Sequence, residues 1–227
     1  MERVELKTSV LQANQEKAAE NRSLFNREGA LVINLMSAPG SGKTSLLEST
    51  IRNLQGRWRI GVIEGDLQTE MDAERIRALG SPSFQINTGT VCHLDARMIA
   101  RALAEFPIRG LDILFIENVG NLICPASYYL GEHLRVVLCG AAEGAEKPRK
   151  YPVMFHNADA VILNKVDVAE ACGVDLGILR SNVRAVNPKT PIFELSCRTG
   201  QGLASWLDWL DASAAARAVP TTAGASA

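Results

Sequence analysis

A glycine-rich stretch carries the clearest chemical signal in this sequence. The stretch SAPGSGKT, residues 37–44, follows the apolar run 31–36 and leads into the helical pattern 43–54. Glycines at positions 40 and 42 let the backbone come close to a phosphate group, so that successive N–H groups surround it. In this strand, loop and helix context, the spacing predicts a phosphate-binding P-loop.

The side chains of this loop predict how it would hold a nucleotide. The Lys43 ammonium is expected to reach the β- and γ-phosphates, and the Thr44 hydroxyl to ligate Mg²⁺. The sequence departs from the general motif at its first position, where Ser37 replaces glycine. A glycine-rich turn that merely starts a helix is the alternative, which context and spacing disfavour. The residues predicted to bind the nucleotide here are Pro39, Gly40, Ser41, Gly42, Lys43, Thr44 and Ser45.

A second motif indicates the base of that nucleotide. Asn164, Lys165 and Asp167 belong to the stretch NKVD, which matches the Asn-Lys-x-Asp guanine motif of P-loop GTPases. The Asp167 carboxylate only accepts hydrogen bonds, which suits the imino and amino groups of guanine and not adenine. Downstream, SCRTGQGL is similar to the loop that closes over guanine, so Ser196 and Cys197 are predicted base contacts. GTP is therefore favoured over ATP.

Two carboxylates stand at the ends of predicted strands. Asp66 follows one apolar run and Glu117 ends another, at positions where acids hold Mg²⁺ through waters and orient the attacking water. We predict that Thr44, Asp66 and Glu117 bind Mg²⁺, and that Lys43, Asp66 and Glu117 are catalytic. A helix-capping Asp66 and a solvated Glu117 are the alternatives. Asp72 is left out, because it could simply support the first turn of its own helix.

These motifs require elements that bring them together. Apolar runs rich in Val and Ile alternate with helical patterns, which is typical of parallel strands joined by crossover helices. Loops at the carboxyl ends of such strands carry the functional site. We predict a three-layer α/β P-loop NTPase fold, with a mostly parallel sheet of about seven strands and helices on both faces. The predicted strands are 31–36, 59–64, 83–87, 112–117, 135–140, 160–165 and 191–196, and the predicted helices 43–54, 69–79, 92–106, 174–186 and 203–210.

Length and composition favour one main domain. The chain has 227 residues, of which 47% are hydrophobic. This length is sufficient for one α/β domain and short for two domains. We predict a GTPase domain over residues 30–212. Residues 1–29 are polar and weakly periodic, which predicts a helical extension, and residues 213–227 are small and polar, which predicts a disordered tail.

Charge and cysteine content narrow the partners and the compartment. The net charge is −1 and no long basic run occurs, so neither nucleic acid nor an anionic membrane surface is expected as a partner. The apolar runs are strand-sized and the first residues are polar, so we expect no membrane span and no secretory signal. Five cysteines favour free thiols over a disulfide framework, and a cytoplasmic location follows.

Seven stretches, taken together, resemble one family. In order and spacing they are similar to the HypB family, the SIMIBI-class GTPases of hydrogenase nickel incorporation, from about Ala30 to Leu210, and the Ser37 departure is included. The resemblance implies a metallochaperone that hydrolyses GTP to GDP and phosphate and helps deliver Ni²⁺ into the [NiFe]-hydrogenase large subunit. It also implies GTP-dependent homodimerisation and a HypA-type nickel chaperone as partner. The stretches are SAPGSGKT, EGDLQTEMDAERI, TGTVCHLDA, ENVGNLICPA, EKPRKYPVMF, LNKVD and SCRTGQGL.

The resemblance further implies a nickel or zinc site. The family's ligands map onto Cys92, His93 and Cys124. Two thiolates and an imidazole suit Zn²⁺ or Ni²⁺, but a tetrahedral zinc needs a further ligand from water or a second chain. Neighbours on a helix diverge by roughly 100°, so both members of the pair can bind one ion only at a frayed helix end or by facing different partners. A subunit interface is therefore attractive. A bare Cys-His pair alone is more often packing and capping.

Three other functions stay open. The urease accessory nickel GTPase is the nearest, although its Cys-Pro-His signature is not matched by Cys124-Pro125-Ala126. Another P-loop metallochaperone and a scaffold that binds GTP without hydrolysing it are the others. Residues 1–29 contain neither Cys nor His, so nickel storage is not expected there, and the segment could instead dock HypA.

Overall fold

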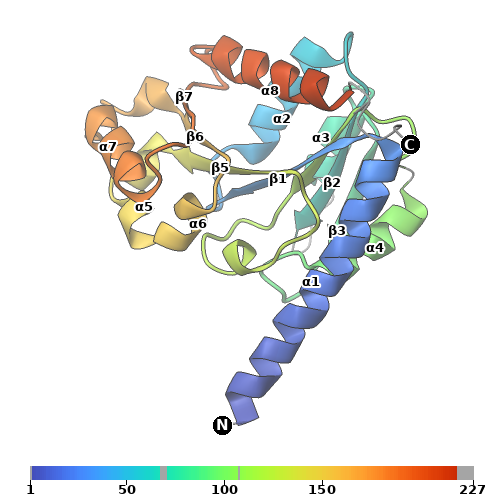
Figure 1. The fold of residues 1–227 in the computed structure, drawn as a ribbon. Helices are drawn as coiled ribbons and strands as arrows, with labels where there is room; N and C mark the ends of the chain where they lie inside the picture. The colour runs from blue at the N-terminus through green and yellow to red at the C-terminus, as the bar shows by residue number, and fades with distance from the viewer. Residues whose placement is uncertain (1, 67–70, 107, 219–227) are drawn as a thin grey trace, which may run out of the picture.

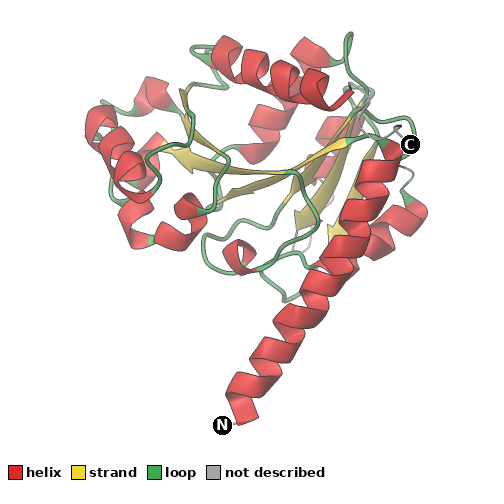
Figure 2. Cartoon of the chain, viewed as in Figure 1, coloured by secondary structure: helices red, strands yellow, loops and turns green. Residues whose placement is uncertain are grey.

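The computed structural model describes residues 2–66, 71–106 and 108–218. Seven parallel strands form one sheet in the order β3-β2-β4-β1-β5-β6-β7, drawn as the central yellow layer of Figure 2. The predicted α/β fold is confirmed, and the sheet is wholly parallel. The strands are β1 (Leu31–Ser37), β2 (Ile60–Asp66), β3 (Ser83–Asn87), β4 (Ile113–Glu117), β5 (Leu134–Gly140), β6 (Ala160–Asn164) and β7 (Ile192–Glu194).

Helices cover both faces of the sheet. Helices α2, α3 and α8 pack on one face, while α1, α4, α6 and α7 pack on the other. Strands β1, β4 and β6 are buried at every position, which is why their sequences are continuous apolar runs. The helices are α1 (Glu2–Glu28), α2 (Lys43–Leu54), α3 (Met71–Arg77), α4 (Ala96–Glu105), α5 (Lys147–Lys150), α6 (Pro152–His156), α7 (Leu176–Val186) and α8 (Leu203–Ala218).

Helix α1 is only partly an extension. Its N-terminal end projects beyond the rest of the molecule, while its second half lies against the body near α4 (Figure 1). There Ala18 and Phe25 are fully buried. The Asn21 amide donates to the carbonyls of Ala96 and Leu130, at 2.9 and 3.0 Å, which joins α1 to the start of α4 and to the loop before β5.

The helix predicted over residues 92–106 begins later than expected. Helix α4 starts at Ala96, because the Asp95 side chain caps it by accepting a hydrogen bond from the Met98 N–H at 2.8 Å. Cys92 and His93 therefore lie in the loop before the helix. The prediction that they begin the helix is wrong.

The prediction of a disordered tail is wrong for residues 213–218. Residues 213–218 continue α8 where disorder was predicted, because Trp206, Leu210 and Ala214 form a buried stripe at a spacing of four residues. Arg217 also donates through Nε to the Ala30 carbonyl at 2.9 Å. Residues 219–227 lie outside the described part of the chain. Within that part, no helix is both long and apolar enough to cross a membrane.

Candidate functional site

The P-loop connects β1 to α2 at the carboxyl edge of the sheet. Gly42 precedes α2 with φ 101°, a left-handed conformation that favours glycine. A Cβ at this position would lie 2.6 Å from Asn164 Nδ2, so a larger residue would also displace that side chain. Lys43 and Thr44 are the first residues of α2, where unpaired backbone N–H groups attract a phosphate.

The NKVD stretch lies directly against the P-loop. Asn164 Nδ2 donates to the Ser41 carbonyl at 2.9 Å, and Asn164 Oδ1 accepts the Cys197 N–H at 3.2 Å. Lys165 Nζ donates to the Gly40 carbonyl at 2.7 Å. Asn164 thus joins three predicted nucleotide-binding segments, namely the P-loop, the NKVD stretch and the loop around residue 197.

The predicted base contacts line one pocket of about 550 Å³. Asp167 Oδ2 accepts a hydrogen bond from Arg198 Nε at 2.9 Å. A hydrogen bond with Ser196, followed by the bond to Arg198, lowers the pKa of Asp167, so the carboxylate stays in its accepting form. The predicted residues on this pocket are Gly42, Ser45, Asn164, Lys165, Asp167, Ser196 and Cys197.

A second pocket, of about 260 Å³, lies at the other end of the P-loop. Thr44 Oγ1 donates to Glu117 Oε1 at 3.1 Å, and Lys43 Nζ lies 4.0 Å from the same oxygen. Lys43 also donates to Ser37 Oγ at 3.1 Å, so the residue that departs from the general motif helps to hold the lysine. The lining residues are Pro39, Lys43, Glu64, Gly65, Asp66, Asp72, Glu117, Asn118, Val119 and Gly120.

This second pocket is short of positive charge. Burial raises the pKa of Glu117 to about 7, with Lys43 opposing the shift. Burial, and then repulsion from Glu117, raises the pKa of Glu64 to about 8. Glu117 Oε2 and Glu64 Oε1 are buried and have no hydrogen-bond partner among the described residues. Uncompensated carboxylate oxygens beside a P-loop threonine fit a hard divalent cation such as Mg²⁺.

Cys92, His93 and Cys124 come together in three dimensions. Their candidate ligand atoms all lie within 4.8 Å of one another, and the two Sγ atoms are 3.2 Å apart. Burial lowers the pKa of His93, which favours the neutral imidazole that metals bind. Because the pair lies in a loop, the divergence expected for neighbours on a helix does not separate the two side chains.

The His93 ring is held by stacking and has a buried nitrogen without a hydrogen-bond partner among the described residues. The His93 ring stacks on Tyr128, with ring centroids 4.0 Å apart. Its Nδ1 atom is buried and unpartnered within the described residues. A buried nitrogen without a partner is costly in a folded protein, and a metal bond would compensate for it.

A chain of side-chain amides connects the two regions. Asn118, next to Glu117, accepts the Leu94 N–H through Oδ1 at 3.1 Å. Its Nδ2 donates to Asn34 Oδ1 at 3.2 Å. The residue after a predicted Mg²⁺ ligand therefore holds the residue after a predicted nickel or zinc ligand.

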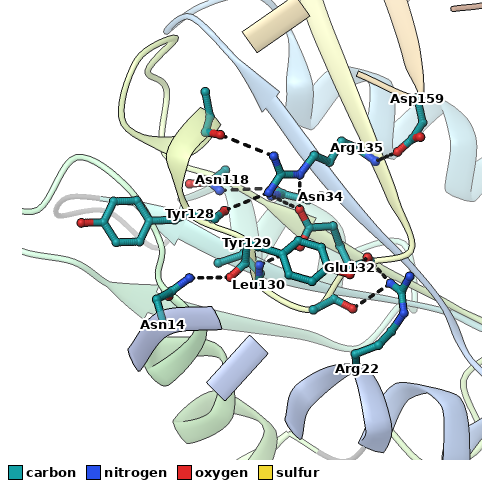
Figure 3. Close-up of polar contacts among 12 residues, drawn as sticks. Asn14, Arg22, Asn34, Asn118, Tyr128, Tyr129, Leu130, Glu132, Arg135 and Asp159 are labelled. Carbon is teal, nitrogen blue, oxygen red and sulfur yellow. Dashed lines mark hydrogen bonds and ion pairs between the residues drawn. The ribbon is translucent and has the colours of Figure 1, made fainter. Parts of the chain in front are cut away.

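The chain of amides continues toward β5, as Figure 3 shows. Asn34 donates to Glu132 Oε1 at 3.3 Å, and Arg135 Nε donates to the same oxygen at 2.7 Å. The Leu130 N–H donates to Glu132 Oε2 at 2.7 Å. Sequence reasoning missed these residues, and the one available signal was a polar Asn34 inside an otherwise apolar strand.

The wholly parallel sheet, with its glycine-rich loop between the central strand β1 and helix α2, defines a P-loop nucleotide-binding protein. The family model described as "CobW/HypB/UreG, nucleotide-binding domain" matches residues 31–194. The chain belongs to this family of P-loop GTPases, and within it to HypB, the hydrogenase maturation factors.

Individual relatives support this membership. The hydrogenase maturation factor HypB of Rhizobium leguminosarum bv. viciae is 47% identical over 216 residues, covering 95% of this chain and 72% of that protein. The crystal structure of HypB from Archaeoglobus fulgidus is 39% identical with a TM-score of 0.85, covering 89% of this chain and 99% of that one. HypB from Helicobacter pylori, solved in complex with nickel, is also 39% identical with a TM-score of 0.85, covering 93% and 100%.

Proposed function

We propose that this protein binds and hydrolyses GTP, with Mg²⁺, and uses the cycle to control a nickel ion during hydrogenase maturation. The observation that carries the proposal is the hydrogen bond between Asn118 and the Leu94 N–H, which connects the nucleotide and metal regions. Membership of the HypB family supports the same cycle.

The protein groups have distinct parts in hydrolysis. Lys43 and the backbone N–H groups at the start of α2 stabilise the charge of the phosphates. Asp167 accepts hydrogen bonds from guanine, while Asp66 and Glu117 hold and orient water at the γ-phosphate end. Mg²⁺, when bound, neutralises charge on the phosphates. The described residues offer no arginine finger here, so we expect slow hydrolysis without a partner.

We propose Cys92, His93 and Cys124 as the ligands of the nickel cargo, with zinc as the competing ion. A thiolate and imidazole set suits both ions, and three ligands leave a position for water or a second chain. The nickel complex of the Helicobacter pylori relative supports nickel. We also propose a GTP-dependent homodimer in the cytoplasm, a HypA-type chaperone that docks on α1, and the hydrogenase large subunit as the receiver.

Coupling follows from the position of Cys124, in the segment that begins at Glu117. Ordering this segment around the γ-phosphate would change the metal ligands, and hydrolysis would reverse the change. By reciprocity, the factor by which the nucleotide changes nickel affinity is also the factor by which nickel changes nucleotide affinity. If saturating nickel changes neither the affinity for GTP nor the affinity for GDP, an equilibrium switch of this kind is ruled out.

Release of inorganic phosphate from GTP tests the enzymatic part. We expect slow release by the wild type and none above background by Lys43→Ala. The matched control is Lys189→Ala, an exposed lysine away from both pockets, which should match the wild type. Wild-type protein that binds GTP but releases no phosphate would instead be a nucleotide-dependent scaffold.

Nickel stoichiometry tests the metal part. Equilibrium dialysis should give a nickel site that is lost in Cys92→Ala and retained in Cys172→Ala. Cys172 is also an exposed thiol and is distant from the cluster in sequence, so it controls for non-specific thiol binding. Retention of the site in Cys92→Ala would argue for a different metallochaperone.

A further inference from the structure

Glu64 is a buried acid without an assigned part in the proposed mechanism. It lies in β2, after the apolar stretch 60–63, and its exposed fraction is 2%. In the sheet its Cα is paired with that of Glu117 on β4. Side chains paired across parallel strands point to the same face, so both carboxyl groups reach the pocket at the γ-phosphate end of the P-loop.

The Glu64 carboxyl has an oxygen available for a ligand. Oε1 is fully buried and has no partner among the described residues, although a buried carboxylate normally accepts hydrogen bonds. Asp66 lies two positions further along β2 and therefore on the same face as Glu64. Glu64 is thus next to two predicted Mg²⁺ ligands, one on its own strand and one on the neighbouring strand.

Acidic groups outnumber basic groups in the pocket around this oxygen, which favours binding of a cation. Four carboxyl groups and one amine, that of Lys43, line the pocket. The charged groups that act on Glu64 are Glu117 on β4 and, from α3, Asp72, Arg77 and Arg75. Arg75 is already paired with Glu48 and Asp72, so it does not compensate the unpaired Glu64 oxygen. Mg²⁺ commonly keeps several of its waters, and these donate hydrogen bonds to nearby acids.

We propose that Glu64 is a positioning residue of the Mg²⁺ site, whose free carboxylate oxygen accepts a hydrogen bond from a water bound to the ion. This inference rests on the proposed binding of GTP with Mg²⁺. It assigns to Glu64 an outer position in the site, behind Thr44, Asp66 and Glu117.

Nucleotide affinity as a function of Mg²⁺ concentration tests the proposal. A fluorescent non-hydrolysable GTP analogue is titrated in EDTA and then at increasing Mg²⁺, with wild type, Glu64→Gln and the control Glu194→Gln. Glu194 ends β7, and its carboxyl is paired with Arg180 outside both pockets. For Glu64→Gln we expect the half-saturating Mg²⁺ concentration to rise about tenfold while affinity in EDTA stays the same or tightens.

Each result decides the question. Identical Mg²⁺ dependence of wild type and Glu64→Gln overturns the proposal, as does an equal loss of affinity in EDTA and in Mg²⁺, which indicates structural damage. If Glu64→Gln does not fold, Glu64→Asp is titrated in the same way, and an unchanged half-saturation overturns the proposal. Wild-type protein that does not bind the analogue at all contradicts the proposed function and not this inference alone.

Discussion

At the scale of single residues, His133 is held in one neutral form. Its Nδ1 accepts the Val32 N–H at 2.9 Å, and its Nε2 lies 3.0 Å from Asn26 Oδ1. The ring proton therefore belongs on Nε2, and a second proton on Nδ1 would oppose the Val32 N–H. Burial, followed by repulsion from Arg22 and Arg217, lowers the pKa of His133 to about 3.

This depressed pKa predicts destabilisation in acid. The unfolded chain takes up a proton near pH 6.5 and the native protein only near pH 3, so stability is complete above about pH 6.5 and falls as the pH drops toward 3. The loss has an upper limit of about 1.4 kcal/mol per pH unit. NMR titration should show a neutral His133 ring at pH 5. In urea unfolding, His133→Asn should reduce the decrease in unfolding free energy as the pH falls from about 6.5 to about 3. A His133 that titrates near pH 6.5 contradicts the prediction.

The site was predictable where its chemistry is local in sequence. Lys43, Thr44 and Asp167 could be proposed from the sequence because each belongs to a contiguous motif with a fixed chemical role. Glu64 and Asn118 were not singled out, because neither belongs to a motif with a fixed chemical role. Their importance depends on burial and on which strands are neighbours, and neither follows from a motif.

At the scale of elements, hydrogen bonds from side-chain amides to the backbone hold α1 against the rest of the protein. Asn21, 4% exposed, donates to two carbonyls of other elements. Asn21→Ala removes both of these buried hydrogen bonds and should lower the free energy of unfolding by about 1–3 kcal/mol. Ser23→Ala, an exposed neighbour bonded only within α1, should change it by less than about 0.5 kcal/mol. Urea unfolding compares them, and equal effects would mean that these contacts contribute little.

Element boundaries were predictable where periodicity sets them. All seven predicted strands agree with the observed strands to within about two residues. For β1, β4 and β6 the reason is burial at every position, which requires continuous apolar runs. The start of α4 depends on one side-chain cap, and the end of α8 depends on contacts with the rest of the domain. The docking of α1 depends on scattered amides and on Phe25, which give a polar sequence no continuous apolar stripe.

At the scale of the whole molecule, the tryptophans report on one half. Trp58, Trp206 and Trp209 belong to the cluster on the α2 and α8 face of the sheet, whereas Phe25 is buried on the opposite face. The strands contribute to both clusters, so unfolding should be one cooperative event. Phe25→Ala should lower stability by about 3–5 kcal/mol, with equal midpoints by tryptophan fluorescence and by circular dichroism. Separate midpoints would show that α1 and its face unfold independently.

The close approach of Gly42 and Asn164 has a consequence for how the two motifs evolve. A side chain at position 42 would displace the amide that holds both the P-loop and the loop around residue 197. A substitution at position 42 or 164 thus alters both motifs, although the two positions are far apart in the sequence. Descendants of this sequence are expected to retain or lose phosphate binding and base recognition together, so the two motifs form one unit under selection.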